Sequence, residues 1–196
     1  TLDGDVDQRG NINGSVGISK IGTIGSISFF PDNKQILITD LDNGIKLLDI
    51  ETTIITLINN EYKPDYIAIH PIDNYALGVK TIGNHTQIHK FMLDNPSEVT
   101  LWWEDDPSAI PPSKISIGKV NGIFISKKGN YLILQSDGIG QSQNTGLFRY
   151  FDLEKEPYEN DGLLRGIKKD HHYARTIALD SESHLLYFIE TPPDNT

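Results

Sequence analysis

The sequence predicts an all-β fold, and three observations support that prediction. One pattern of fifteen residues occurs four times without gaps, at residues 26–40, 66–80, 122–136 and 176–190. Each copy has alternating apolar residues, then a polar turn, then a short apolar run. The apolar spacing of an amphipathic helix, every three or four residues, is not sustained anywhere for three turns.

Each copy of the pattern is expected to form a β-hairpin. "SISFFPDNKQILITD" opens with Ile27 and Phe29, whose spacing of two is that of a strand with one buried face. The turns "PDNK", "PIDN", "KKGN" and "SESH" contain residues that favour tight reversals. The runs that follow, such as "YLILQ", fit strands buried on both faces. We expect equivalent buried positions at Ile27, Ile67, Ile123 and Ile177.

Two weaker strands follow each of the first three hairpins, for example "IKLLDI" and "IITLI" after the first. Four antiparallel strands in a recurring unit are typical of a β-propeller blade. The sequence therefore predicts a β-propeller with about three full blades plus one hairpin. The expected divisions are an N-terminal segment at 1–24 and blades at 25–60, 65–105, 121–168 and 175–196, the last of them partial.

The stretch "FFPDNKQILITDLDNGIKLLDIET" resembles a blade of the WD40-like propellers, in particular the YVTN, lactonase-like group of bacterial repeats. The resemblance covers roughly residues 25–190 and implies the fold. It also implies one candidate activity, because lactonase-like propellers hydrolyse esters at the mouth of the ring. The later units depart from the pattern, with Lys127 and Ser181 in place of its proline. A shared fold implies no shared function.

Two interpretations of the lone fourth hairpin stay open. In the preferred one the chain is part of a larger propeller, and it associates with a missing segment or with a second copy because open sheet edges invite pairing. In the other, "GNINGSVGISKIGTIG" at residues 10–25 returns as a strap that closes a small four-bladed ring.

Composition limits the classes of partner. With 17 Lys and Arg against 27 Asp and Glu, the formal net charge is -10, which disfavours nucleic acid and anionic membrane surfaces. The sequence contains no apolar run long enough to span a membrane and no cysteine. These observations leave the compartment open, with bacterial export to the periplasm or the exterior among the choices. No cofactor is predicted.

Candidate binding residues lie in the loops of one face. The loops at 104–119, 136–146 and 168–174 should project the same way, and binding groups are often mounted on such loops. Trp102 and Trp103 end a strand, so one should face inward, and we expect this to be Trp102. Trp103 is then the expected aromatic anchor. The predicted ligand-binding residues are Trp103, Asp105, Asp106, Gln141, His171 and His172.

Two candidate functions, from different functional classes, remain open. The preferred one is a non-catalytic propeller that binds a protein or peptide through this loop-rich face. The alternative is a metal-assisted, lactonase-like hydrolase. Asp105 and Asp106 with His171 and His172 have the chemistry of metal ligands, but their spacing is not diagnostic. The sequence also lacks a Gly-x-Ser-x-Gly elbow, so neither metal ligands nor catalytic residues are assigned.

Overall fold

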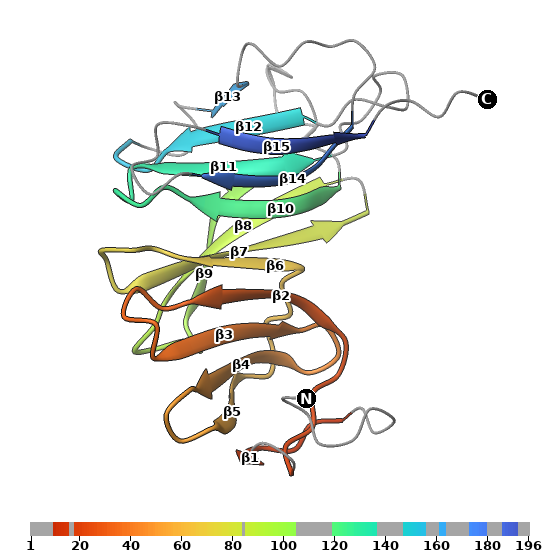
Figure 1. The fold of residues 1–196 in the computed structure, drawn as a ribbon, viewed down its shortest axis with the longest axis vertical. Helices are drawn as coiled ribbons and strands as arrows, with labels where there is room; N and C mark the ends of the chain where they lie inside the picture. Colours follow the sequence, from red (N-terminus) through yellow and green to blue (C-terminus); the bar gives the residue numbers. More distant parts are fainter. Residues whose placement is uncertain are drawn as a thin grey trace, which may run out of the picture. The chain divides into compact units, whose positions relative to one another are not determined.

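The computed structural model of the chain consists of β-strands joined by turns (Figure 1). It describes residues 10–15, 18–83, 85–104, 119–136, 147–155, 161–163, 173–179 and 186–191. None of these residues forms a helix that is long and apolar enough to cross a membrane. The chain divides into two compact units, residues 1–80 with 89–100, and residues 81–88 with 101–196.

The first blade is a five-stranded antiparallel sheet. Its strands are β1 (Gly14–Ser15), β2 (Ile24–Phe29), β3 (Gln35–Asp40), β4 (Gly44–Asp49) and β5 (Ile54–Asn59). Their order in space is β1-β5-β4-β3-β2, so that β2 is the inner strand of the predicted blade. The short β1 comes from the N-terminal segment and pairs with β5, at the outer edge of this blade.

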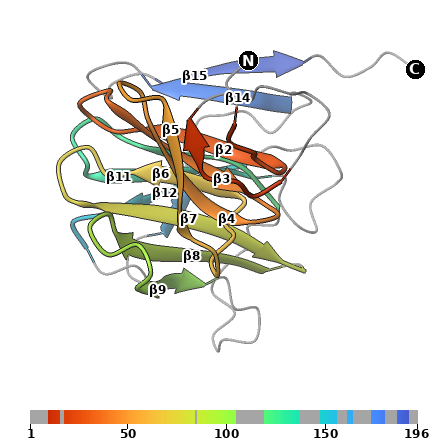
Figure 2. The ribbon, with the colours of Figure 1, turned by 90° about the horizontal axis from the view of Figure 1, so that it is seen from below.

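The second and third blades have the predicted four strands each. The second contains β6 (Tyr66–Ile69), β7 (Tyr75–Ile82), β8 (His85–Met92) and β9 (Val99–Glu104), paired in chain order (Figure 2). The third contains β10 (Val120–Ile125), β11 (Tyr131–Ser136), β12 (Leu147–Asp152) and β13 (Asp161–Leu163). The last hairpin consists of β14 (Tyr173–Leu179) and β15 (Leu186–Thr191).

All four inner hairpins share one strand register, which confirms the repeat. In each of them the second residue of the fifteen-residue pattern pairs with the thirteenth. The four pairs are Ile27 with Ile38, Ile67 with Gly78, Ile123 with Leu134, and Ile177 with Phe188. The backbone turn recurs as well: Asn33 and Gly129 hold the same column and both have positive φ, 58° and 76°. Asn and Gly are the residues that tolerate this conformation best.

A hydrophobic core joins the first blade to the second within one unit. Leu37 and Ile45 from the first blade cluster with Ile67, Ile69 and Phe91 from the second. The inner strands also meet through hydrogen bonds, because the Ser26 and Ser28 hydroxyls accept the backbone N–H groups of Ile67 (2.9 Å) and Ile69 (3.1 Å). Burial of such aliphatic side chains contributes roughly 1.5–3 kcal/mol each.

The opposite face of the first blade has a second cluster, in which Ile21 of the N-terminal segment packs on Ile36, Ile38, Leu48 and Ile55. Ile21 lies over β3, β4 and β5 and leaves β2 open. The expectation that Ile27 is buried like Ile67 is therefore wrong, because its exposed fraction is 53%. Ile67 and Ile123 are buried as expected, while the side chain of Ile177 lies outside the described residues.

Candidate functional site

The candidate site lies at the end of β5, where the chain leaves the first blade for the second. Asn59 fixes this connection with its side-chain amide. Its Oδ1 accepts the N–H groups of Glu61 (2.9 Å) and Tyr62 (2.8 Å), and its Nδ2 donates to the carbonyl of Pro96 at 2.6 Å. Asn59 is itself buried, so these bonds satisfy a polar group that would be costly to leave unpaired.

Tyr62 belongs to the same connection, and its side chain is buried in the core. Its ring packs edge-on against Phe91 and lies 4.9 Å from the ring centre of His89. Its hydroxyl has no hydrogen-bond partner among the described residues. Burial first, and the nearby Asp65 second, raise the pKa of Tyr62 far above its ordinary value, so the hydroxyl stays neutral.

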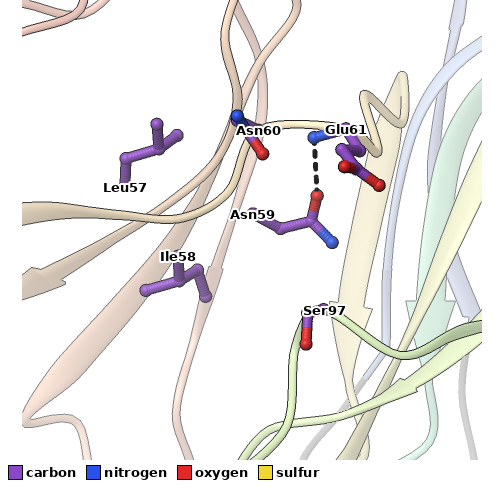
Figure 3. A pocket seen from close by; sticks show the side chains of 6 residues that line it. All are labelled: Leu57, Ile58, Asn59, Asn60, Glu61 and Ser97. Atoms are coloured by element: carbon purple, nitrogen blue, oxygen red, sulfur yellow. Dashed lines mark hydrogen bonds between the residues drawn. The ribbon is translucent and has the colours of Figure 1, made fainter.

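A cavity of about 230 Å³ opens beside this connection (Figure 3). One wall is aliphatic, from Leu57 and Ile58, and the rim is polar, from Asn60, Glu61 and Ser97. Asn59 lies between them and points its amide oxygen at the Glu61 backbone (Figure 3). Asn60 and Glu61 are exposed, so their side chains face solvent at the mouth of the cavity.

The β3–β4 turn braces the other side of the connection. Lys63 donates from Nζ to the backbone carbonyl of Asp42. Asp40, at the base of this turn, is fully buried beside Lys46, with 3.3 Å between Oδ2 and Nζ. Burial opposes ionisation of Asp40, but hydrogen bonds from Gly22, Asn43 and Lys46 outweigh it and lower the pKa of Asp40 below its ordinary value. The Lys63 side chain therefore ties the connection at 60–65 to this turn.

The side chains that line the cavity supply polar and apolar contact groups. Ser97 donates its hydroxyl proton to Asn95 Oδ1 at 2.8 Å, and an amide oxygen is no general base. Glu61 supplies a carboxylate, Asn60 an amide and Leu57 an aliphatic surface, which together suit a peptide with a basic group. Among the described residues no three His, Asp or Glu side chains gather in a way that could hold a metal ion.

Most of the residues predicted to bind a ligand lie outside the described part of the chain: Asp105, Asp106, Gln141, His171 and His172. That grouping remains a prediction. Sequence reasoning did not find the cavity residues. The available signal was the polar "NNEYKPD", which follows the apolar run of β5, but nothing local shows that Asn59 faces inward.

The assignment of the two tryptophans is reversed. Trp103 is fully buried, while Trp102 is only partly so. Both rings meet Phe151 of β12 edge-on, with centroids 5.1 Å away for Trp103 and 5.7 Å for Trp102. Alternation along a strand shows that two neighbours point opposite ways, but the packing partner decides which way is inward. Trp103 is a core residue and is not available as an exposed anchor.

Comparisons with known proteins identify the fold class. No protein-family model matches the chain, and no curated protein matches it by sequence. Solved structures do match. A nidogen from a crystal structure of a nidogen–laminin complex has a TM-score of 0.61 at 15% identity over 87% of this chain and 56% of its own. TolB from Acinetobacter baumannii has a TM-score of 0.65 at 15% identity over 91% of this chain and 40% of its own.

A third match is a protein of unknown function from Bacteroides thetaiotaomicron, with a TM-score of 0.65 at 13% identity over 97% of this chain and 44% of its own. These structures are β-propellers. Together with the antiparallel blades described above, they confirm that the chain has a β-propeller fold. At such low identity they show the fold alone, and this chain spans about half of their length or less.

Proposed function

We propose that this chain is a non-catalytic β-propeller scaffold that binds a protein or peptide partner. The observation that supports this most directly is the cavity beside Asn59, which combines an aliphatic wall with an amide and carboxylate rim. Apolar pockets with a few placed polar groups are typical of binding sites. The hydroxyl at the rim, that of Ser97, donates to the amide oxygen of Asn95.

The proposed contact surface is the loop-rich face on which the links between blades lie. Residues 60–65 are such a link. The residues predicted from the sequence, Asp105, Asp106, Gln141, His171 and His172, are proposed as a second, separate set of binding residues. The partner has basic features, because the chain has a net charge of -10 and Glu61 adds a carboxylate at the cavity.

The test uses short random peptides displayed on phage and selected on the immobilised chain, with the affinity of synthetic copies measured by calorimetry. The double change Asn60→Ala and Glu61→Gln should weaken binding by about tenfold or more, because a hydrogen bond to a charged group is lost. Binding should also weaken in high salt, which screens charges beyond about 8–10 Å.

Glu51→Gln is the matched control. It removes the same charge from an exposed residue in the β4–β5 turn, away from the cavity. Affinity that falls equally in both variants would mean that only net charge matters. Turnover of an ester or lactone that requires a divalent ion would overturn the proposal in favour of the hydrolase alternative.

A further inference from the structure

Polar groups at the rim of the cavity beside Asn59 are free mainly as hydrogen-bond acceptors. Ser97 donates its hydroxyl proton to Asn95 Oδ1 at 2.8 Å, so its oxygen is left as an acceptor. The Asn59 amide is largely used, because its Oδ1 accepts two backbone N–H groups and its Nδ2 donates to the carbonyl of Pro96. Glu61 adds a carboxylate, which only accepts when it is ionised. The rim therefore favours a ligand with several donors.

The negative charge at this rim is not neutralised within the described part of the chain. No described side chain pairs with the Glu61 carboxylate. Lys63, the nearest cation along the chain, donates to the backbone carbonyl of Asp42 instead. Glu61 is exposed, and Figure 3 shows its carboxylate on the opposite side of the view from Leu57 and Ile58. A cation that enters the cavity would therefore meet a carboxylate that has no other partner there.

The size and the aliphatic wall of the cavity limit what can enter it. Its volume of about 230 Å³ is below the roughly 300–1,000 Å³ of pockets that enclose a drug-sized molecule. One side chain is therefore a better fit than a whole small ligand. Leu57 and Ile58 provide apolar surface, and Ile58 is held in place because it packs against the core between the first two blades. Long basic side chains bury their methylene stems on such surfaces and keep the charged end among polar groups.

We propose that this cavity binds one arginine side chain of a peptide partner, an inference that rests on the scaffold function proposed above. The methylene stem lies on Leu57 and Ile58, and the guanidinium reaches Glu61. The polar groups of the rim come from two segments, Asn60 and Glu61 from the link after β5, and Ser97 from the β8–β9 turn. A guanidinium has five donors in a planar fork and can bond to both segments, whereas an ammonium is a compact charge that holds its water more strongly. Lysine should therefore bind more weakly.

A nuclear magnetic resonance titration tests this directly, because it detects weak binding at individual backbone N–H groups. The probe is the peptide Gly-Gly-Arg-Gly-Gly with blocked ends, added to the isotope-labelled chain. The N–H signals of Glu61 and Tyr62, which donate to Asn59 Oδ1, should shift and saturate. The same peptide with citrulline, which has the shape of arginine without its charge, should bind about tenfold more weakly or worse. The lysine peptide should bind about threefold more weakly or worse.

Substitutions separate the cavity from the rest of the acidic surface. Glu61→Gln keeps the shape of an exposed side chain and removes its charge, so it should weaken the arginine peptide by about tenfold and leave the citrulline peptide unchanged. Glu51→Gln is the matched control, because it removes the same charge from the exposed β4–β5 turn and should change neither. Ser97→Ala removes the acceptor of the second segment, so it should weaken the arginine peptide more than the lysine peptide.

Several results would overturn the inference. Equal affinity for the arginine and lysine peptides would mean that the cavity responds to charge alone. Shifts that are absent from residues 57–61 and 97, or an equal loss in Glu61→Gln and Glu51→Gln, would mean that the peptide binds elsewhere on the acidic surface. Free arginine that binds as tightly as the peptide would show that the ligand is an amino acid and not a peptide.

A failure of this inference can be told apart from a failure of the scaffold proposal. Peptides selected on the immobilised chain should lose affinity when their arginines are replaced by citrulline. If they bind equally well after that change, the inference is overturned and the scaffold proposal stands. If no peptide can be selected and the arginine probe does not bind, both are contradicted.

Discussion

The Lys46 Nζ lies 3.3 Å from Asp40 Oδ2, and both side chains have no exposed surface. Lys46 also donates to the backbone carbonyl of Lys20, so the pair ties the N-terminal segment to the β3–β4 hairpin. Removing one partner of a buried ion pair typically costs about 3–5 kcal/mol, because the other charge is left buried without compensation. Asp40→Asn should therefore lower the free energy of unfolding by about that amount, as measured in urea.

The same pair should make stability depend on pH in acid. The pKa of Asp40 in the folded chain lies below its ordinary value of 3.8. The ionised carboxylate therefore stabilises the fold in full above pH 3.8, and this contribution is lost as the pH falls below that value. Urea titrations of the natural chain at decreasing pH should show the loss, and Asp40→Asn should show less of it. Lys155→Gln, which breaks a pair between the exposed Lys155 and the partly buried Asp152, is the control and should change little.

The core between the first two blades gives a second prediction. Ile67→Ala should lower the free energy of unfolding by about 2–5 kcal/mol, because a cavity forms among Leu37, Ile69 and Phe91. The matched change Ile72→Ala removes the same atoms from an exposed turn and should fall within about 0.5 kcal/mol of the natural chain. Similar losses in both variants would contradict the packing described here.

Local features of the sequence were enough to predict the hairpins and their register. Alternation with a period of two predicts each strand, and a turn residue such as Asn33 or Gly129 predicts the reversal between two strands. Both signals depend only on residues close together in the sequence. The same local rules account for the four-stranded blades. They succeed because the two strands of each inner hairpin and their turn lie close together in the sequence.

Features that depend on distant partners could not be predicted in this way. The exposure of Ile27 follows from what lies beside β2, and the sequence of β2 does not contain that information. The inward direction of Trp103 depends on Phe151 in another blade. The cavity is lined by Asn59 of the first blade and Ser97 of the second, which are far apart in the sequence. The predicted binding residues Asp105, Asp106, Gln141, His171 and His172 lie outside the described part of the chain and remain a prediction.

The two tryptophans can be distinguished by fluorescence, because the chain contains no others. In Trp102→Phe the remaining Trp103 is fully buried, so its emission should lie at short wavelength and resist quenching by acrylamide. In Trp103→Phe the remaining Trp102 should be quenched more readily, since it is only partly buried. If Trp103 proves to be the more accessible of the two, the packing against Phe151 described here is wrong.

The close approach of Gly78 to Tyr62 gives the last prediction. A Cβ added at Gly78 would lie 2.6 Å from the Tyr62 hydroxyl oxygen and 2.8 Å from a ring carbon, distances that side chains do not tolerate. Gly78→Ala should therefore destabilise the fold by about 1–3 kcal/mol, as overpacking of a core typically does. Tyr62→Phe alone should cost little, because the hydroxyl has no hydrogen-bond partner among the described residues.

Combining the two changes tests the contact itself. Tyr62→Phe removes the nearer of the two clashing atoms but leaves the ring carbon, so the double variant should recover only part of the stability lost in Gly78→Ala. Urea unfolding of the four chains measures this as the coupling energy of a double-mutant cycle. Strictly additive effects would show that Tyr62 does not approach Gly78. The anchoring of the link at 60–65 by that ring would then need another explanation.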